Sequence, residues 1–138
     1  MDLKTVRKKA KAILNALGLN DEELSILFVD DLKIAELNRA YRNKTGPTNV
    51  LSFSMREGEF GGVTPMLGDV VISADTALRE AIEAGITFDE RLSQLLVHGI
   101  LHLVDYDHER SDNEARRMED KSLELLRIIE NNPGLAVF

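Results

Sequence analysis

The stretch from Leu92 to Val104 is the longest part of this chain without Asp, Glu, Lys or Arg. Just upstream, Thr87 and Glu90 have the spacing of a capping box, which marks the first turn of an α-helix. The leucines that follow recur at helical spacing, as they do in a helix that faces a protein core. The stretch is far shorter than the roughly 18 apolar residues that a membrane span needs. It therefore predicts a helix packed against the core of a globular domain.

The patterns on both sides of this helix predict one α+β domain. Apolar residues at helical spacing, short β-compatible runs and turn signals define its elements. We expect helices at residues 3–17, 31–41, 74–84, 87–105 and 111–131, strands at 23–29, 49–55 and 68–73, and a turn or irregular edge segment at 57–65. Asp30 or Asp31 should cap the second helix and Ser73 the third, while Gly46-Pro47 should break the second. This order predicts a single domain over residues 1–138, with a small mixed sheet of about four strands flanked by about five helices.

The composition excludes several kinds of site. The chain has 138 residues and no cysteine. The lack of cysteine rules out disulfides, zinc ribbons, thiol nucleophiles and iron–sulfur clusters, and it fits a reducing compartment. Basic residues from Arg7 onward interrupt any signal-peptide core near the N-terminus. We therefore expect a cytoplasmic protein with no membrane partner.

The charge is unevenly distributed along the chain. A formal net charge of −7 argues against a nucleic-acid partner, because phosphate binding needs local positive charge. From Leu37 to Arg56, however, there is no acidic residue, and this segment contains Arg39, Arg42, Lys44 and Arg56. The segment is either a chance gap in a mixed surface or a place where a polyanion binds.

All three histidines of the chain lie between His98 and His108. His98 and His102 are four residues apart on the predicted helix, so their rings should point to the same side, as in helices that offer two imidazoles to one metal ion. A helix that ends near Asp105 would let the chain turn back and bring His108 to the same ion. Three imidazoles suit zinc, although nickel, copper or iron can use the same ligands. They also leave a fourth position for water, as catalytic zinc sites do.

The residue after the first histidine bears on the kind of metalloenzyme. Zinc peptidases have a glutamate there, which acts as the general base. Here the position holds Gly99. The sequence therefore disfavours a peptidase.

Three segments resemble one known family. His98–His108 (HGILHLVDYDH) resembles the signature of the YbeY family of bacterial rRNA-maturation endoribonucleases. Tyr41–Phe53 (YRNKTGPTNVLSF) and Gly68–Ser73 (GDVVIS) resemble two further motifs of that family, so the resemblance covers nearly the whole chain. Asp105 stands where the family usually has glycine.

This resemblance implies a metal-dependent, single-strand-specific endoribonuclease that acts in ribosomal RNA maturation and ribosome quality control. It implies that His98, His102 and His108 bind one zinc ion per chain in a cleft, and that Arg42 is the arginine needed for activity. The expected partners are single-stranded and ribosomal RNA, together with the small ribosomal subunit. A guanidinium matches the oxygens of a phosphate, so the basic segment would hold RNA near the metal. A salt bridge at a helix end is the alternative role for Arg42.

Two other functions remain open at this point. A ribosome assembly factor with a structural zinc would have all four metal positions filled by protein groups. A zinc hydrolase of small molecules or peptides would have a narrow pocket without Arg42 and Lys44 at its rim. The remaining candidates are weaker. Asp107 and Glu109 could orient a histidine ligand or accept a proton, and Tyr41 and Phe53 could stack on bases. Capping or strand-edge roles are expected for Asn49, Ser52 and Ser73.

Overall fold

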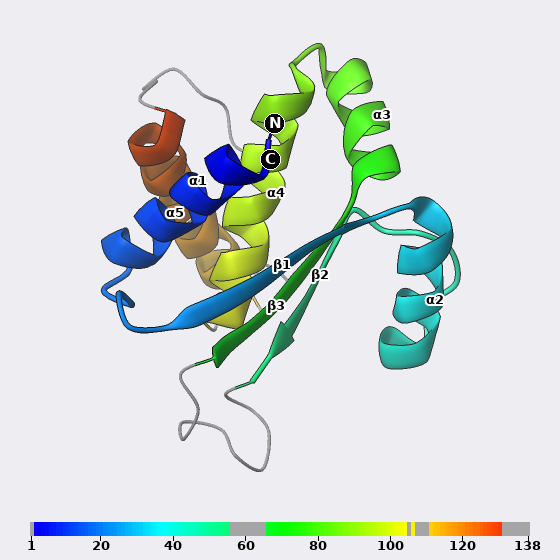
Figure 1. Cartoon of the computed structure of the whole chain (residues 1–138), viewed down its shortest axis with the longest axis horizontal. Helices are drawn as coiled ribbons and strands as arrows, with labels where there is room; N and C mark the ends of the chain where they lie inside the picture. The colour runs from blue at the N-terminus through cyan, green and yellow to red at the C-terminus, as the bar shows by residue number, and fades with distance from the viewer. Residues whose placement is uncertain (1, 56–65, 105, 107–110, 131–138) are drawn as a thin grey trace.

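The chain folds into the expected α+β arrangement. The computed structural model describes residues 2–55, 66–104, 106 and 111–130. The elements are α1 (Leu3–Ala16), β1 (Glu23–Val29), α2 (Asp31–Arg42), β2 (Val50–Ser54), β3 (Met66–Ser73), α3 (Ala74–Ala84), α4 (Phe88–Leu103) and α5 (Asp112–Glu130). Figure 1 shows their arrangement. The described residues form a sheet of three strands, one fewer than the approximate number expected.

The sheet is mixed, with β3 in the middle and β1 and β2 at its two edges. β1 runs parallel to β3, with Ile26 opposite Val70. β2 runs antiparallel to β3, with Ser52 opposite Val70 on the other side. β1 and β2 lie on opposite sides of β3, so the segment between them, which contains α2, has to pass over β3.

The two faces of the sheet are covered unequally. The larger core contains residues of α1, α3, α4 and α5 packed on one face, where Val50, Val70 and Ile72 point. On the other face only a small cluster forms, in which Ile34 of α2 packs against Leu51 and Val71. Figure 1 shows α2 on one side of the sheet and α1, α4 and α5 on the other.

Helix α4 lies at the centre of the larger core, as its apolar sequence predicts. Gly99 lets it approach the sheet closely. A Cβ atom at this position would lie 2.6 Å from Cγ1 of Val70 and 3.2 Å from Cγ2 of Val50. Packing therefore explains the glycine that follows the first histidine.

A partly buried polar cluster joins three helices. Lys9 of α1 donates to the hydroxyl of Ser93 on α4 over 2.8 Å and pairs with the carboxylate of Glu130 on α5. The Ser93 hydroxyl donates to the same carboxylate. Each donor thus has a partner, which buried polar groups require. The cluster fixes the start of α4 between the first and the last helix.

The helix ends follow local signals, with one correction. Asp30 caps α2 by accepting from the backbone of Lys33, and Ser73 caps α3 by accepting from Thr76. The capping box of Thr87 and Glu90 is formed. Helix α2 ends at Arg42, within one residue of the expected end at Tyr41, but Asn43 ends it by adopting the left-handed conformation at φ 54°, and not Gly46-Pro47 as we expected.

Asp31 links the first turns of α2 and α3. Its carboxylate accepts hydrogen bonds from the hydroxyls of Ser73 and Thr76, over 2.7 and 2.6 Å, and from the guanidinium of Arg79 over 2.7 Å. These donors favour the charged form and lower the pKa of Asp31 from 3.8 to about 2.

Candidate metal centre

His98 and His102 lie one turn apart near the end of α4, and their rings meet on the same side of the helix. Their Nε2 atoms are 3.1 Å apart. The ring centroids are 4.6 Å apart, and the ring planes are inclined at 72°. Both side chains are partly buried. The helical spacing therefore produces the convergence that it predicted.

This geometry fits two ligands of one metal ion. Two nitrogens that bind the same tetrahedral zinc at about 2.0–2.1 Å lie about 3.3 Å from each other. The separation of the two Nε2 atoms is close to this value. A neutral imidazole can also donate from one ring nitrogen, so in the absence of metal the pair can share a hydrogen bond. Imidazole nitrogens are also a donor type that zinc prefers.

The third expected ligand, His108, lies outside the described residues, as do Asp105, Asp107 and Glu109. Helix α4 ends at Leu103, with Val104 as its C-cap, close to the end expected near Asp105. Within the described ranges, no group of three His, Cys, Asp or Glu side chains gathers around one point. The contribution of His108 and the cleft expected around the metal therefore stay predictions.

Ser52 supports the histidine pair from the sheet. Its hydroxyl donates to the backbone carbonyl of Gly99 over 2.8 Å, in the turn between the two histidines. We expected only a role at a strand edge for this residue. The alternation of β2 places Ser52 on the same face as the buried Val50, and a hydroxyl on that apolar face is the sequence signal that points to its role.

Arg42 is the last residue of α2 and has an exposed side chain. It makes no ion pair with any residue that the structure describes, so the helix-end salt bridge considered above is not found there. α2 and α4 pack on opposite faces of the sheet. Arg42 and the histidines therefore approach from different faces, and no contact between them is observed within the described ranges.

The edge strand β2 lies between the end of α2, which carries Arg42, and the turn of α4 that carries the histidines. Tyr41, next to Arg42, packs edge-on against Phe53 of β2, with ring centroids 5.2 Å apart. Ser52, which precedes Phe53 and points to the opposite face of the strand, donates to the carbonyl of Gly99 on α4. A single edge strand thus separates Arg42 from the turn that carries the histidines. Tyr41 is 69% exposed, whereas Phe53 packs against the small cluster under α2.

Comparison with known proteins decides the family. The family model for the endoribonuclease YbeY matches residues 1–130. The chain belongs to the YbeY family. A curated YbeY endoribonuclease from Geobacter metallireducens is 58% identical over 127 residues, which cover 91% of this chain and 85% of that protein. One from Aquifex aeolicus is 51% identical over 115 residues, covering 83% and 75%. These findings confirm the resemblance seen in the three motifs.

A solved structure supports the fold. The solution structure of a protein from Thermotoga maritima superimposes with a TM-score of 0.67 at 26% identity and covers 94% of this chain and 81% of the other. The α+β prediction is confirmed. None of the described helices is long and apolar enough to cross a membrane.

The three YbeY motifs meet around β2 and β3. The glycine of the GDVVIS motif, Gly68, faces the carbonyl of Phe53 and the side chain of Leu103, and a Cβ atom would collide with both. Asn49 donates to Glu80 of α3 over 3.3 Å, and Glu80 also accepts from Arg91 of α4 over 2.9 Å. The motif residues Asn49 and Gly68 therefore position the strands against α4.

Proposed function

We propose that this chain is a zinc-dependent endoribonuclease that cleaves single-stranded RNA during ribosomal RNA maturation and ribosome quality control. Residues 1–138 form its single domain, and it works in the cytoplasm, with the small ribosomal subunit as a further partner. Family membership supports this proposal, because the curated relatives are described as endoribonucleases. The observation that carries the metal dependence is the 3.1 Å separation of the two histidine nitrogens on α4.

His98, His102 and His108 hold one zinc ion per chain in this proposal. The first two present their nitrogens at a spacing that suits a tetrahedral ion. The packing of Gly99 on Val70 and the hydrogen bond from Ser52 keep that spacing fixed. When bound, zinc supplies a Lewis acid that can polarise a phosphoryl oxygen and lower the pKa of a water molecule.

Arg42 acts on the phosphate that is cleaved. Its guanidinium is exposed at the end of α2, where it can donate to two phosphate oxygens at once. Charge that develops on those oxygens is then stabilised by this guanidinium. Arg39 and Lys44 are also exposed and hold the neighbouring RNA backbone by their charge. The buried Asn38 donates to the carbonyl of Gly46 over 2.9 Å and so fixes the loop that carries Lys44.

The test compares wild-type protein with His102→Ala, each with its zinc content measured, on a single-stranded RNA and on a duplex of the same sequence. Zinc-loaded wild type should cleave the single strand. Chelation should abolish cleavage, and added zinc should restore it. His102→Ala should bind less zinc and cleave little. Arg7→Ala replaces an exposed residue of α1 and serves as the control variant, which should bind zinc and cleave RNA as wild type does.

Zinc-loaded wild type that cleaves neither substrate nor ribosomal RNA would overturn the proposal. A ribosome assembly factor with a structural zinc would then be the better description. Cleavage that survives complete removal of zinc would overturn the metal dependence alone.

A further inference from the structure

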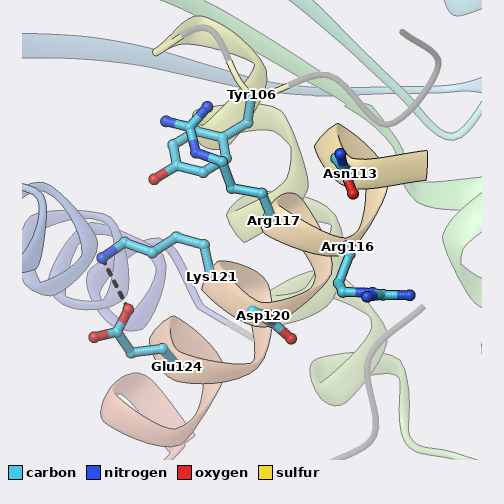
Figure 2. A pocket seen from close by; sticks show the side chains of 7 residues that line it. All are labelled: Tyr106, Asn113, Arg116, Arg117, Asp120, Lys121 and Glu124. Atoms are coloured by element: carbon cyan, nitrogen blue, oxygen red, sulfur yellow. Dashed lines mark ion pairs between the residues drawn. The ribbon is translucent and has the colours of Figure 1, made fainter. Parts of the chain in front are cut away.

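A shallow hollow with a volume of about 490 Å³ lies along α5, beside the residue that follows α4. Figure 2 shows the ring of Tyr106 at one side of it and the side chains of α5 along the rest. Sites for small ligands have volumes of roughly 300–1,000 Å³, so one nucleotide fits here. The described residues that line the hollow do not include His98, His102 or Arg42.

Tyr106 and Arg117 form a stack in this hollow. The guanidinium carbon of Arg117 lies 4.4 Å from the centre of the Tyr106 ring. The side chain of Arg117 nevertheless remains 57% exposed. The guanidinium thus lies over the ring without being buried, and one of its nitrogens also pairs with Glu114 over 3.4 Å. A flat cation held in this way is a surface on which an unpaired base can stack.

Charges of both signs line the hollow. Lys121 pairs with Glu124 over 2.8 Å, and this carboxylate raises the pKa of Lys121. Asp120 is exposed on the same stretch of α5. Carboxylates repel the phosphate groups of a nucleic-acid backbone, but they accept hydrogen bonds from the 2′-hydroxyl of ribose and from base amino groups. The lining therefore suits a ribonucleotide with its base and sugar better than phosphate alone.

Tyr106, at one side of the hollow, is bonded through its backbone to the last turn of α4. The backbone N–H of Tyr106 donates to the carbonyl of Leu101 over 3.0 Å, and Leu101 immediately precedes His102. A strand cleaved at the histidines extends away from them on both sides. Tyr106 therefore lies where a neighbouring nucleotide of the same strand can be bound.

We propose that this hollow is a subsite for a nucleotide of the single-stranded RNA substrate that flanks the cleaved position. The base stacks on Arg117, and the 2′-hydroxyl of the ribose donates to Asp120. The subsite rests on the proposed function, because the strand that it binds is the one cleaved at the histidines.

The experiment measures binding of an unstructured RNA oligonucleotide to metal-free protein by fluorescence anisotropy, so that no cleavage occurs. Arg117→Ala should weaken binding by about 5- to 100-fold, the scale of one lost base stack. Arg127→Ala removes the same charge from α5 outside the hollow and should change the affinity less than about twofold. Wild type should bind RNA more tightly than DNA of the same sequence, and Asp120→Ala should reduce that preference.

Thermal unfolding of each variant shows whether it is folded. If Arg117→Ala does not fold, Arg117→Lys is measured in its place. This variant keeps the charge but loses the planar group, so it should still bind the RNA more weakly than wild type. RNA affinities that are equal for wild type, Arg117→Lys and Arg127→Ala would overturn the subsite. Wild type that binds RNA through Arg117 but does not cleave it when zinc-loaded would overturn the proposed function, and the hollow would then be an RNA-binding site and not a subsite of a nuclease.

Discussion

The hydroxyl of Ser52 donates a hydrogen bond to the carbonyl of Gly99, and this bond ties an edge strand to the helix turn between two histidines. Strand β2 contacts a neighbour of Arg42 and a neighbour of the two histidines. Its Phe53 packs against Tyr41, next to Arg42, and its Ser52 holds α4. Substitutions in β2 should therefore change the zinc affinity as well as the free energy of unfolding.

Ser52→Ala tests this relationship directly. Removing a single hydrogen bond should lower the free energy of unfolding by about 0.5–1.5 kcal/mol. If the whole effect acts on the position of the histidines, zinc affinity should fall by up to about tenfold. Urea unfolding of metal-free protein and competitive zinc titration measure the two effects. Ser52→Thr keeps the hydroxyl and should retain most of the stability and most of the zinc affinity. If Ser52→Ala changed neither measurement, the role given to this hydrogen bond would be wrong.

Gly99→Ala tests the close approach of α4 to the sheet. The added methyl group would overlap with Val70, and overpacking of this kind costs about 1–3 kcal/mol of unfolding free energy. The double variant Gly99→Ala/Val70→Ala has room for the methyl group. It should be more stable than the sum of the two single changes predicts, as urea unfolding in a double-mutant cycle would show. Strict additivity would mean that the two residues do not compete for space.

Replacing each histidine by alanine tests the metal centre. About one zinc ion per wild-type chain should be found by metal analysis, and His98→Ala, His102→Ala and His108→Ala should each reduce its affinity sharply. The fold should survive, because a domain of this size has its own core. Full zinc binding by His108→Ala would show that the third ligand is another residue, with Asp107 and Glu109 the next to test.

Arg42→Ala separates catalysis from metal binding. Losing one fixed charge-stabilising donor should lower RNA cleavage by roughly two to three orders of magnitude, while zinc content stays the same. Arg42→Lys should rescue little, because an ammonium lacks the two-pronged geometry of a guanidinium. Lys44→Ala should weaken RNA binding only modestly and change its salt dependence. Single-turnover cleavage assays give these values, and undiminished cleavage by Arg42→Ala would remove arginine from the mechanism.

Asp31→Asn tests the link between α2 and α3 through its pH dependence. The hydroxyls of Ser73 and Thr76, and then Arg79, lower the pKa of Asp31 to about 2 in the folded protein. A folded pKa below the unfolded value gives stability that is present above about pH 5 and is lost as the pH falls towards 2. The stability difference between wild type and Asp31→Asn should therefore be constant near neutrality and shrink in acid. Urea unfolding of zinc-free protein across this pH range measures the difference, and one that does not depend on pH would argue against the ionised carboxylate.

Local features of the fold could be predicted from the sequence because their causes are local. The capping box of Thr87 and Glu90 and the cap at Ser73 lie within a few residues of the helices that they start. The convergence of His98 and His102 was predictable for the same reason, since one helical turn sets it. The end of α2 was predicted to within one residue, but the residue that ends it was not, because Asn43 adopts a left-handed conformation that is usual only for glycine.

Contacts between distant segments could not be predicted in this way. Ser52 and Gly99 are 47 residues apart, and no periodicity relates them. The placement of α2, which carries Arg42, on the face of the sheet opposite to α4 depends on which face the chain covers between β1 and β2. The alternation of β2 showed that it has two faces but not which helix covers each one.

The contact between Lys9 and Glu130 spans 121 residues and has a consequence for biosynthesis. Helix α5 follows all the other described elements in the chain, and it covers α4 and α1 in the larger core. Until it leaves the ribosome, the apolar surface of α4 has no complete cover, and contacts of such long range form late because a large loop must close first. A nascent chain stalled before α5 should therefore be prone to aggregation or bound by chaperones, and its histidine pair should become stably fixed only after synthesis of α5 is complete.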